Sequence, residues 1–228
     1  MTQPFPAPGH AAYGPATRYQ SAKGLAVAAA VLAGLGAFIE VVDVPLAWIA
    51  GEQLEDAAAR GVPPGEVITA FDVMGLPTLG VYVAAWIVSA LWLSRARTNA
   101  EVLNPRCHHK RSAGWAWFGW IVPVVSLWFP YQYVRDVRLA TVTEERRHSP
   151  VVGWWWAAWL VSQHVGLAGG LVVTPPGSDA VRFGLLAPVE GVAAVLAIVA
   201  LVGWLRIIRQ VTEDQDAVAR GRPIAATV

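Results

Sequence analysis

The sequence predicts an all-α fold, namely a polytopic integral membrane protein with four transmembrane helices and a Trp/Pro-rich re-entrant or interfacial helical element. Of its 228 residues, 55% are hydrophobic and 14% are charged, whereas a soluble domain carries about 25% charged residues. The apolar residues form long blocks, and about 20 of them in a helix cross a hydrocarbon core of about 30 Å. The blocks lack the period-two alternation of barrel strands, so helices are expected.

The blocks divide the chain into a tail, a membrane domain and a second tail. Residues 1–20 are rich in Pro, Gly and Ala, and they predict a disordered cytoplasmic tail. They lack the basic region of a secretory signal, so we expect the first span to remain as an uncleaved anchor. The membrane domain is predicted over residues 21–212, with spans at about 22–50, 70–94, 151–173 and 183–207. Residues 213–228 are predicted to form a cytoplasmic C-terminal tail that begins as a charged continuation of the last helix.

A fifth apolar segment, residues 113–131, determines the predicted topology. Lysine and arginine favour cytoplasmic loops. If the segment crosses the membrane, the 17 basic residues divide almost evenly between the two sides. If it enters and leaves on one side, only Arg60 and Arg182 lie outside. The second arrangement predicts four spans in the cell membrane with both termini cytoplasmic.

The composition of this segment, "GWAWFGWIVPVVSLWFPYQYVRDVR" over residues 114–138, supports the same arrangement. It is short for a span, Pro123 should break or kink its helix, and tryptophan prefers the headgroup level. The alternative is a short, kinked fifth span. The residues predicted to form the interfacial element are Trp115, Trp117, Trp120, Pro123, Trp128, Pro130, Arg135 and Arg138.

His164 and Glu190 each interrupt an apolar span, where an ionisable group is costly and usually faces a partner or a cavity. By the rise per residue their heights differ by one to two helical turns, so neighbouring antiparallel helices could bring them together. A functional interpretation is a proton relay or a substrate contact. The structural interpretation, which we prefer, is a buried polar clasp between the last two helices.

Two further groups could bind metal. Glu40, Asp43 and Asp72 are predicted near one level at the outer side, where three carboxylates could hold a cation, although solvated surface charges are the simpler interpretation. Cys107 and the adjacent residues His108 and His109 could bind zinc, but no second Cys/His pair completes a four-ligand site. We therefore predict no metal and no cofactor.

The Trp-rich run "GWAWFGWIVPVVSLWFPYQYVRDVRLA" and the helix ending "RIIRQVTEDQ" resemble the actinobacterial membrane proteins grouped as domain-of-unknown-function family 4328 (DUF4328). The Pro-rich tail before the first span is also similar. The resemblance covers about residues 25–218 and implies several spans with no established activity, so it supplies no catalytic residue.

No phosphate loop, nucleophile elbow or metalloprotease motif occurs in the sequence. The preferred hypothesis is a non-enzymatic multi-pass membrane protein that interacts with anionic lipid, or with a membrane-protein partner or a second copy, through its cytoplasmic Trp/Arg-rich face. The alternative is a small transporter or proton-coupled carrier that uses His164 and Glu190. Nucleic acid is not an expected partner. Whether these two residues line an open cavity or fill a closed helix contact distinguishes the two hypotheses.

Overall fold

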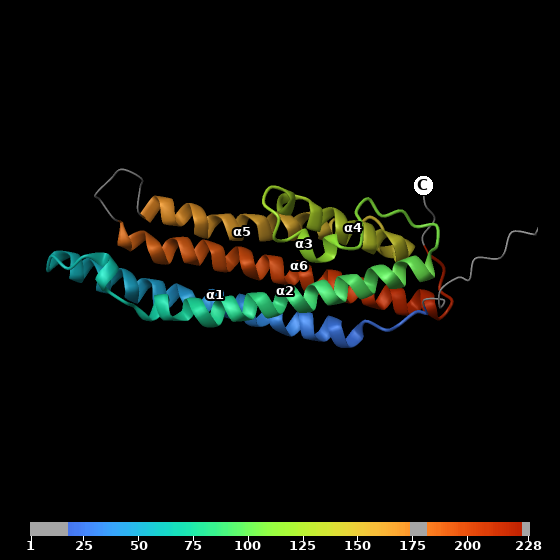
Figure 1. Cartoon of the computed structure of the whole chain (residues 1–228), viewed down its shortest axis with the longest axis horizontal. Helices are drawn as coiled ribbons and strands as arrows, with labels where there is room; N and C mark the ends of the chain where they lie inside the picture. Colours follow the sequence, from blue (N-terminus) through green and yellow to red (C-terminus); the bar gives the residue numbers. More distant parts are fainter. Residues whose placement is uncertain (1–17, 174–181, 225–228) are drawn as a thin grey trace, which may run out of the picture.

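The structure is a computed structural model that describes residues 18–173 and 182–224, and over these residues it consists of helices without β-strands. Four long helices lie side by side in an elongated bundle (Figure 1). They are α1 (Lys23–Ala59), α2 (Ala70–Leu103), α5 (Val151–Val173) and α6 (Leu186–Ala219). The shorter elements are η1 (Pro64–Glu66), α3 (Trp115–Phe118), η2 (Val125–Leu127), α4 (Phe129–Thr141), η3 (Glu144–Arg146) and η4 (Phe183–Leu185). The all-α prediction is confirmed.

Among the described residues, three helices are long and apolar enough to cross a membrane: Lys23–Ala59, Ala70–Leu103 and Phe183–Ala219. They correspond to the first, second and fourth predicted spans, and α5 forms a helix over the predicted third. Each of the three extends beyond the predicted span, since α1 continues to Ala59 and α6 to Ala219. Helix α1 contains Pro45 in its interior.

The four long helices are connected so that residues 104–150 begin and end at one end of the bundle. Helix α5 packs against α6, α6 against α1, and α1 against α2. The end of α2 and the start of α5 lie at the same end as the start of α1 and the end of α6 (Figure 1). The segment between α2 and α5 therefore does not run the length of the bundle.

Residues 113–131 do not form one continuous helix. Helix α3 has four residues, and the chain then turns sharply after Pro123. Val124 has φ 65° and ψ −53°, and the Val125 N–H donates to the Pro123 carbonyl at 2.7 Å, which is the geometry of a strained classic γ-turn. The chain then returns through α4. The break expected at Pro123 is confirmed.

The end of the bundle where α1 begins and α6 ends has a polar interior. Asn99, Gln215 and Asp216 are all buried there. The Asn99 amide donates to the Gln20 carbonyl at 2.8 Å and to Gln215 at 3.2 Å, and Lys23 pairs with Asp216 at 2.8 Å. The first part of the predicted C-terminal tail, up to Ala219, is thus a packed part of α6. Of the predicted N-terminal tail, residues 1–17 lie outside the described residues.

Candidate functional site

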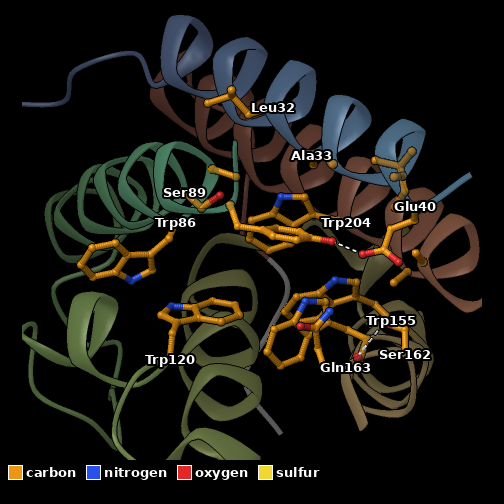
Figure 2. Close-up of a pocket in the computed structure, with 18 of the residues that line it drawn as sticks. Leu32, Ala33, Glu40, Trp86, Ser89, Trp120, Trp155, Ser162, Gln163 and Trp204 are labelled. Carbon is orange, nitrogen blue, oxygen red and sulfur yellow. Dashed lines mark hydrogen bonds between the residues drawn. The ribbon is translucent and has the colours of Figure 1, made fainter. Parts of the chain in front are cut away.

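A cavity of about 410 Å³ lies among α1, α2, α5 and α6, and the segment between α2 and α5 contributes part of its wall (Figure 2). Most of its wall is apolar, with several aromatic rings and a few polar groups among the lining residues. The aromatic side chains are Tyr82, Trp86, Trp120, Trp155, Trp159 and Trp204, and the polar ones are Glu40, Ser89, Ser162 and Gln163.

Each helix supplies its part of the wall from one face, because residues three or four apart lie on the same side of an α-helix. Leu32, Gly36 and Glu40 are spaced by four along α1. On α2, Tyr82 is followed by Trp86 and Ser89 at the fourth and seventh positions. Gly36 faces the Tyr82 ring, and a β-carbon there would lie in ordinary contact with it, 3.5 Å from Tyr82 Cε1.

The tryptophans hold one another in place. The Trp155 and Trp204 rings stack with centroids 5.0 Å apart, and Trp120 lies edge-on to Trp159 at 5.6 Å. The Trp120 indole N–H donates to the Ala116 carbonyl at 3.2 Å. Such aromatic contacts add about 0.5–1.5 kcal/mol per pair beyond the burial of area. The wall is therefore built from fixed rings.

Residues 113–131 form a bridge between α2 and α5. The Trp86 indole donates to the Trp117 carbonyl at 3.2 Å, and the Trp156 indole donates to the Leu127 carbonyl at 2.9 Å. Trp115, Trp117 and Trp120 are half-buried, whereas Trp128 is 40% exposed. Three of the four tryptophans predicted to lie in the headgroup layer thus pack partly against the protein. Pro123 is exposed beside the turn, and Pro130 is buried in the first turn of α4.

The predicted outer carboxylates are divided between two places. Glu40 accepts a hydrogen bond from the Tyr82 hydroxyl at the cavity wall, and the Asp43 and Glu190 charges also act on that tyrosine. Asp72 instead caps α2: its carboxylate accepts from the Thr69 backbone at 2.8 Å, and its own N–H donates to the Thr69 hydroxyl at 3.3 Å. Among the described residues, no three His, Cys, Asp or Glu side chains form a metal-binding group.

His164 and Glu190 share no hydrogen bond or ion pair in the described part of the chain. His164 is exposed, and its Nδ1 lies 2.7 Å from the Leu160 carbonyl oxygen on its own helix. The charges that act on Glu190 are the carboxylates of Glu40 and Asp43. Neither His164 nor Glu190 is among the residues that line the cavity, so the structure does not bring the predicted pair together.

A comparison with protein-family models matches the part of the chain that runs from before α2 into α6. A family model described as "Domain of unknown function (DUF4328)" matches residues 68–213, more than half of the chain. The chain belongs to the DUF4328 family. The match starts before α2 and ends within α6, so it includes the Trp-rich segment, while α1, which supplies Glu40, precedes it. No curated protein and no solved structure matches the chain.

The two arginines that follow the Trp-rich segment of this DUF4328 protein differ in exposure. Arg135 is half-buried and lies 3.7 Å from Asp136. Arg138 is only 3% exposed, and it donates to Gln210 at 3.3 Å and to the Arg146 carbonyl. The prediction that Arg138 faces outward at the membrane surface is therefore wrong. The physical reason is that α4 packs this side chain against α6, where side-chain and carbonyl oxygens satisfy its donors.

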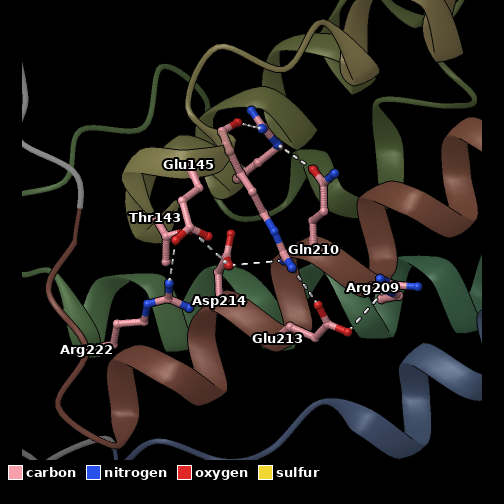
Figure 3. A network of polar contacts seen from close by, with 9 residues as sticks. Thr143, Glu145, Arg209, Gln210, Glu213, Asp214 and Arg222 are labelled. Carbon is pink, nitrogen blue, oxygen red and sulfur yellow. Dashed lines mark hydrogen bonds and ion pairs between the residues drawn. The ribbon is translucent and has the colours of Figure 1, made fainter.

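Arg138 belongs to a polar network between α4, η3 and α6 (Figure 3). Arg146 pairs with Asp214 at 3.2 Å and with Glu213 at 2.9 Å, and Glu213 also pairs with Arg209 at 3.1 Å. Burial raises the pKa of Asp214, although the Arg146 charge opposes that shift. The network fastens the segment between α2 and α5 to the end of α6.

Cys107 and His109 approach each other in the loop after α2, with Sγ and Nε2 3.4 Å apart. Burial lowers the pKa of the His109 imidazole, and the positive charge of Arg97 lowers it further. No described residue completes a metal site with this pair. The arrangement is a local contact that buries a neutral imidazole.

Most of the cavity was not predicted from the sequence. Glu40 was predicted to belong to an outer carboxylate cluster, and Tyr82, Ser89 and Gln163 were not predicted as site residues. The signal was the helical spacing of Tyr82, Trp86 and Ser89 on α2. It was hidden because tryptophan and alanine are common on both lipid-facing and protein-facing surfaces of a membrane helix.

Proposed function

We propose that this DUF4328 protein is a non-enzymatic membrane protein that binds a small molecule in the tryptophan-walled cavity. The cavity carries the proposal. Ligand sites are concave, have volumes of about 300–1,000 Å³, and have mostly apolar walls with a few placed polar groups. The volume of about 410 Å³ and the mixture of rings with Glu40, Ser89 and Gln163 correspond to that description.

The topology we propose has four spans, with α5 as the third in chain order and both termini cytoplasmic. Residues 113–131 are then a re-entrant element. Trp86, which donates to the Trp117 carbonyl of this element, lies eight residues before the inner end predicted for the second span. Trp159, which packs against the Trp120 ring, lies eight residues after the start of α5. Eight residues correspond to about 12 Å in a helix. Both helices thus support the same depth of insertion.

The outer surface of this element is apolar and supports contact with lipid. Its exposed large hydrophobic side chains are Phe118, Ile121, Val124, Leu127 and Trp128. Lys110 and Arg106 are exposed in the adjoining loop, and each basic residue near an anionic leaflet contributes about 1 kcal/mol of attraction. The cytoplasmic face therefore keeps its proposed role as the surface that contacts lipid, a membrane-protein partner or a second copy. Arg138 is no longer part of that surface.

A small carrier is the second candidate function, and the position of Glu40 favours it. A carboxylate in a cavity between apolar helices is a common feature of substrate or proton pathways. The sequence predicted a carrier that uses His164 and Glu190, but neither residue lines the cavity. In the carrier proposed here, Glu40 is the ionisable group that contacts the substrate.

Filling the cavity tests the proposed function. A small-molecule library would be screened for compounds that raise the melting temperature of the full chain in a neutral detergent. A ligand present at 100 times its Kd stabilises by about 2.7 kcal/mol. Ser89→Trp should abolish the stabilisation by filling the cavity, whereas Val83→Trp, at an exposed position on the same helix, should retain it. Absence of any compound with this dependence on position 89 would overturn the proposal.

Cysteine labelling in spheroplasts tests the topology, after Cys107 is replaced by serine. A cysteine in place of the exposed Glu66 should react with an impermeant reagent, and one in place of the exposed His148, which follows the segment, should not. Labelling of position 148 from outside would mean that residues 113–131 cross the membrane and would contradict a re-entrant segment on the cytoplasmic side.

A further inference from the structure

We infer that the ligand of the cavity is an organic cation with an apolar or aromatic body, held between the carboxylate of Glu40 and the tryptophan rings. This inference rests on the proposed function and names its ligand class.

The charge around the cavity is negative. Glu40 is the one charged side chain among the described residues that line it. The Glu40 carboxylate accepts a hydrogen bond from the Tyr82 hydroxyl, which fixes it at the cavity wall. The carboxyl groups of Asp43 and Glu190 lie near enough to interact electrostatically with the same tyrosine. The ion pairs that join described residues include none of these three carboxylates, so a cationic ligand would meet no competing positive charge there.

The walls suit a cation that carries apolar groups. Tryptophan presents the most favourable ring face for a positive charge, and the attraction grows when water is excluded. Five tryptophans line the cavity, and contacts between their rings leave little freedom to reorient. Each ring also offers apolar area to the body of the ligand.

The size of the cavity and the positions of its oxygen atoms favour an organic cation over a metal ion. A hard cation needs six to eight oxygen ligands at 2.3–2.6 Å for calcium, or about six for magnesium. The described lining residues with side-chain oxygens are Glu40, Tyr82, Ser89, Ser162 and Gln163, but they come from three different helices. A volume of about 410 Å³ is better filled by a molecule than by an ion.

Two ions of the same shape and opposite charge test the inference on the wild-type chain. Tetraphenylphosphonium and tetraphenylborate differ mainly in charge, so shape alone predicts similar affinities. Binding would be measured by equilibrium dialysis of the full chain in a neutral detergent, and by quenching of tryptophan fluorescence. Partition into detergent is removed by subtracting the binding seen with Ser89→Trp, the cavity-filled variant. We expect the phosphonium to bind at least about tenfold more tightly than the borate, because only the cation gains from Glu40.

Glu40→Gln then tests the role of the carboxylate. The amide carbonyl can still accept from Tyr82, so the helix contact is retained while the charge is lost. We expect the phosphonium to lose about tenfold or more in affinity, whereas Glu190→Gln, outside the lining, should change it less. If Glu40→Gln does not fold, the comparison of the two ions on the wild type still tests whether the cavity prefers a cation.

The outcomes separate the two proposals. Equal affinity for both ions, preference for the borate, or an unchanged affinity in a folded Glu40→Gln variant would overturn the cation inference while leaving a ligand cavity. Binding of both ions that is identical in wild type and Ser89→Trp would place neither ion in the cavity and would overturn the cation inference. The library screen described above tests the proposed function independently of charge.

Discussion

Replacing Gly203 with alanine should push α5 and α6 apart. A β-carbon at this position in α6 would lie 2.7 Å from Trp155 Cβ, and 2.8 and 2.9 Å from the Trp154 ring atoms Cζ3 and Cη2. The Trp154 ring tip can rotate away. The Trp155 Cβ is attached directly to the backbone of α5, so only a shift of one helix relative to the other relieves that contact.

The cost follows from these distances. Overpacking a close contact by one methyl group costs about 1–3 kcal/mol. Alanine also gains up to about 1 kcal/mol in helix propensity over glycine, so we expect a net destabilisation of about 1–2 kcal/mol. At about 2–4 °C per kcal/mol for a chain of this size, the melting temperature should fall by about 2–8 °C.

Gly191→Ala is the matched control, because it lies in the same helix and a β-carbon there would meet nothing within 4 Å. It should leave the melting temperature unchanged or raise it slightly through propensity. Both variants would be compared with the wild type by thermal unfolding of the full chain in one detergent. If Gly203→Ala were as stable as Gly191→Ala, the close approach of α6 to Trp155 would be wrong.

Three further predictions follow from the polar groups. Arg138→Gln should lower stability by about 1–3 kcal/mol because buried acceptors lose a donor, while Arg135→Gln, at a half-exposed position, should change the thermal melt little; equal effects would contradict the buried position of Arg138. The losses from His164→Leu and Glu190→Leu should add within about 0.5 kcal/mol, since the two side chains share no contact, and a coupling well above that value would restore the predicted clasp. The pKa of His109 is lower in the folded chain than in the unfolded chain, so the unfolded chain binds more protons as the pH falls. The contribution of His109 to the free energy of unfolding is therefore highest above about pH 6.5 and decreases as the pH falls from there through the folded pKa. His109→Gln should flatten the decline in melting temperature below about pH 6.5.

The sequence by itself determined the helices and the break between them. Long apolar blocks predict helices because the backbone must satisfy its hydrogen bonds internally in lipid. Pro123 predicted the interruption in the fifth segment, because proline removes a helical hydrogen bond, and the chain does turn there. The unequal division of basic residues predicted a segment that returns to its own side of the membrane; this stays a prediction, and the ends of α2 and α5 lie at the same end of the bundle (Figure 1). These features depend on composition and on local chemistry, which a single sequence contains.

Only the tertiary structure decided which polar groups meet and where the cavity lies. Glu40 faces Tyr82 across two helices, and Glu190 is influenced by Glu40 and Asp43 instead of His164. Arg135 and Arg138 are the same residue type three positions apart, yet α6 buries only the second. The reason is that helix rotation, tilt and neighbour are set by packing between helices. In a membrane the lipid-facing and protein-facing surfaces are both apolar, so hydropathy does not indicate which face of a helix turns inward.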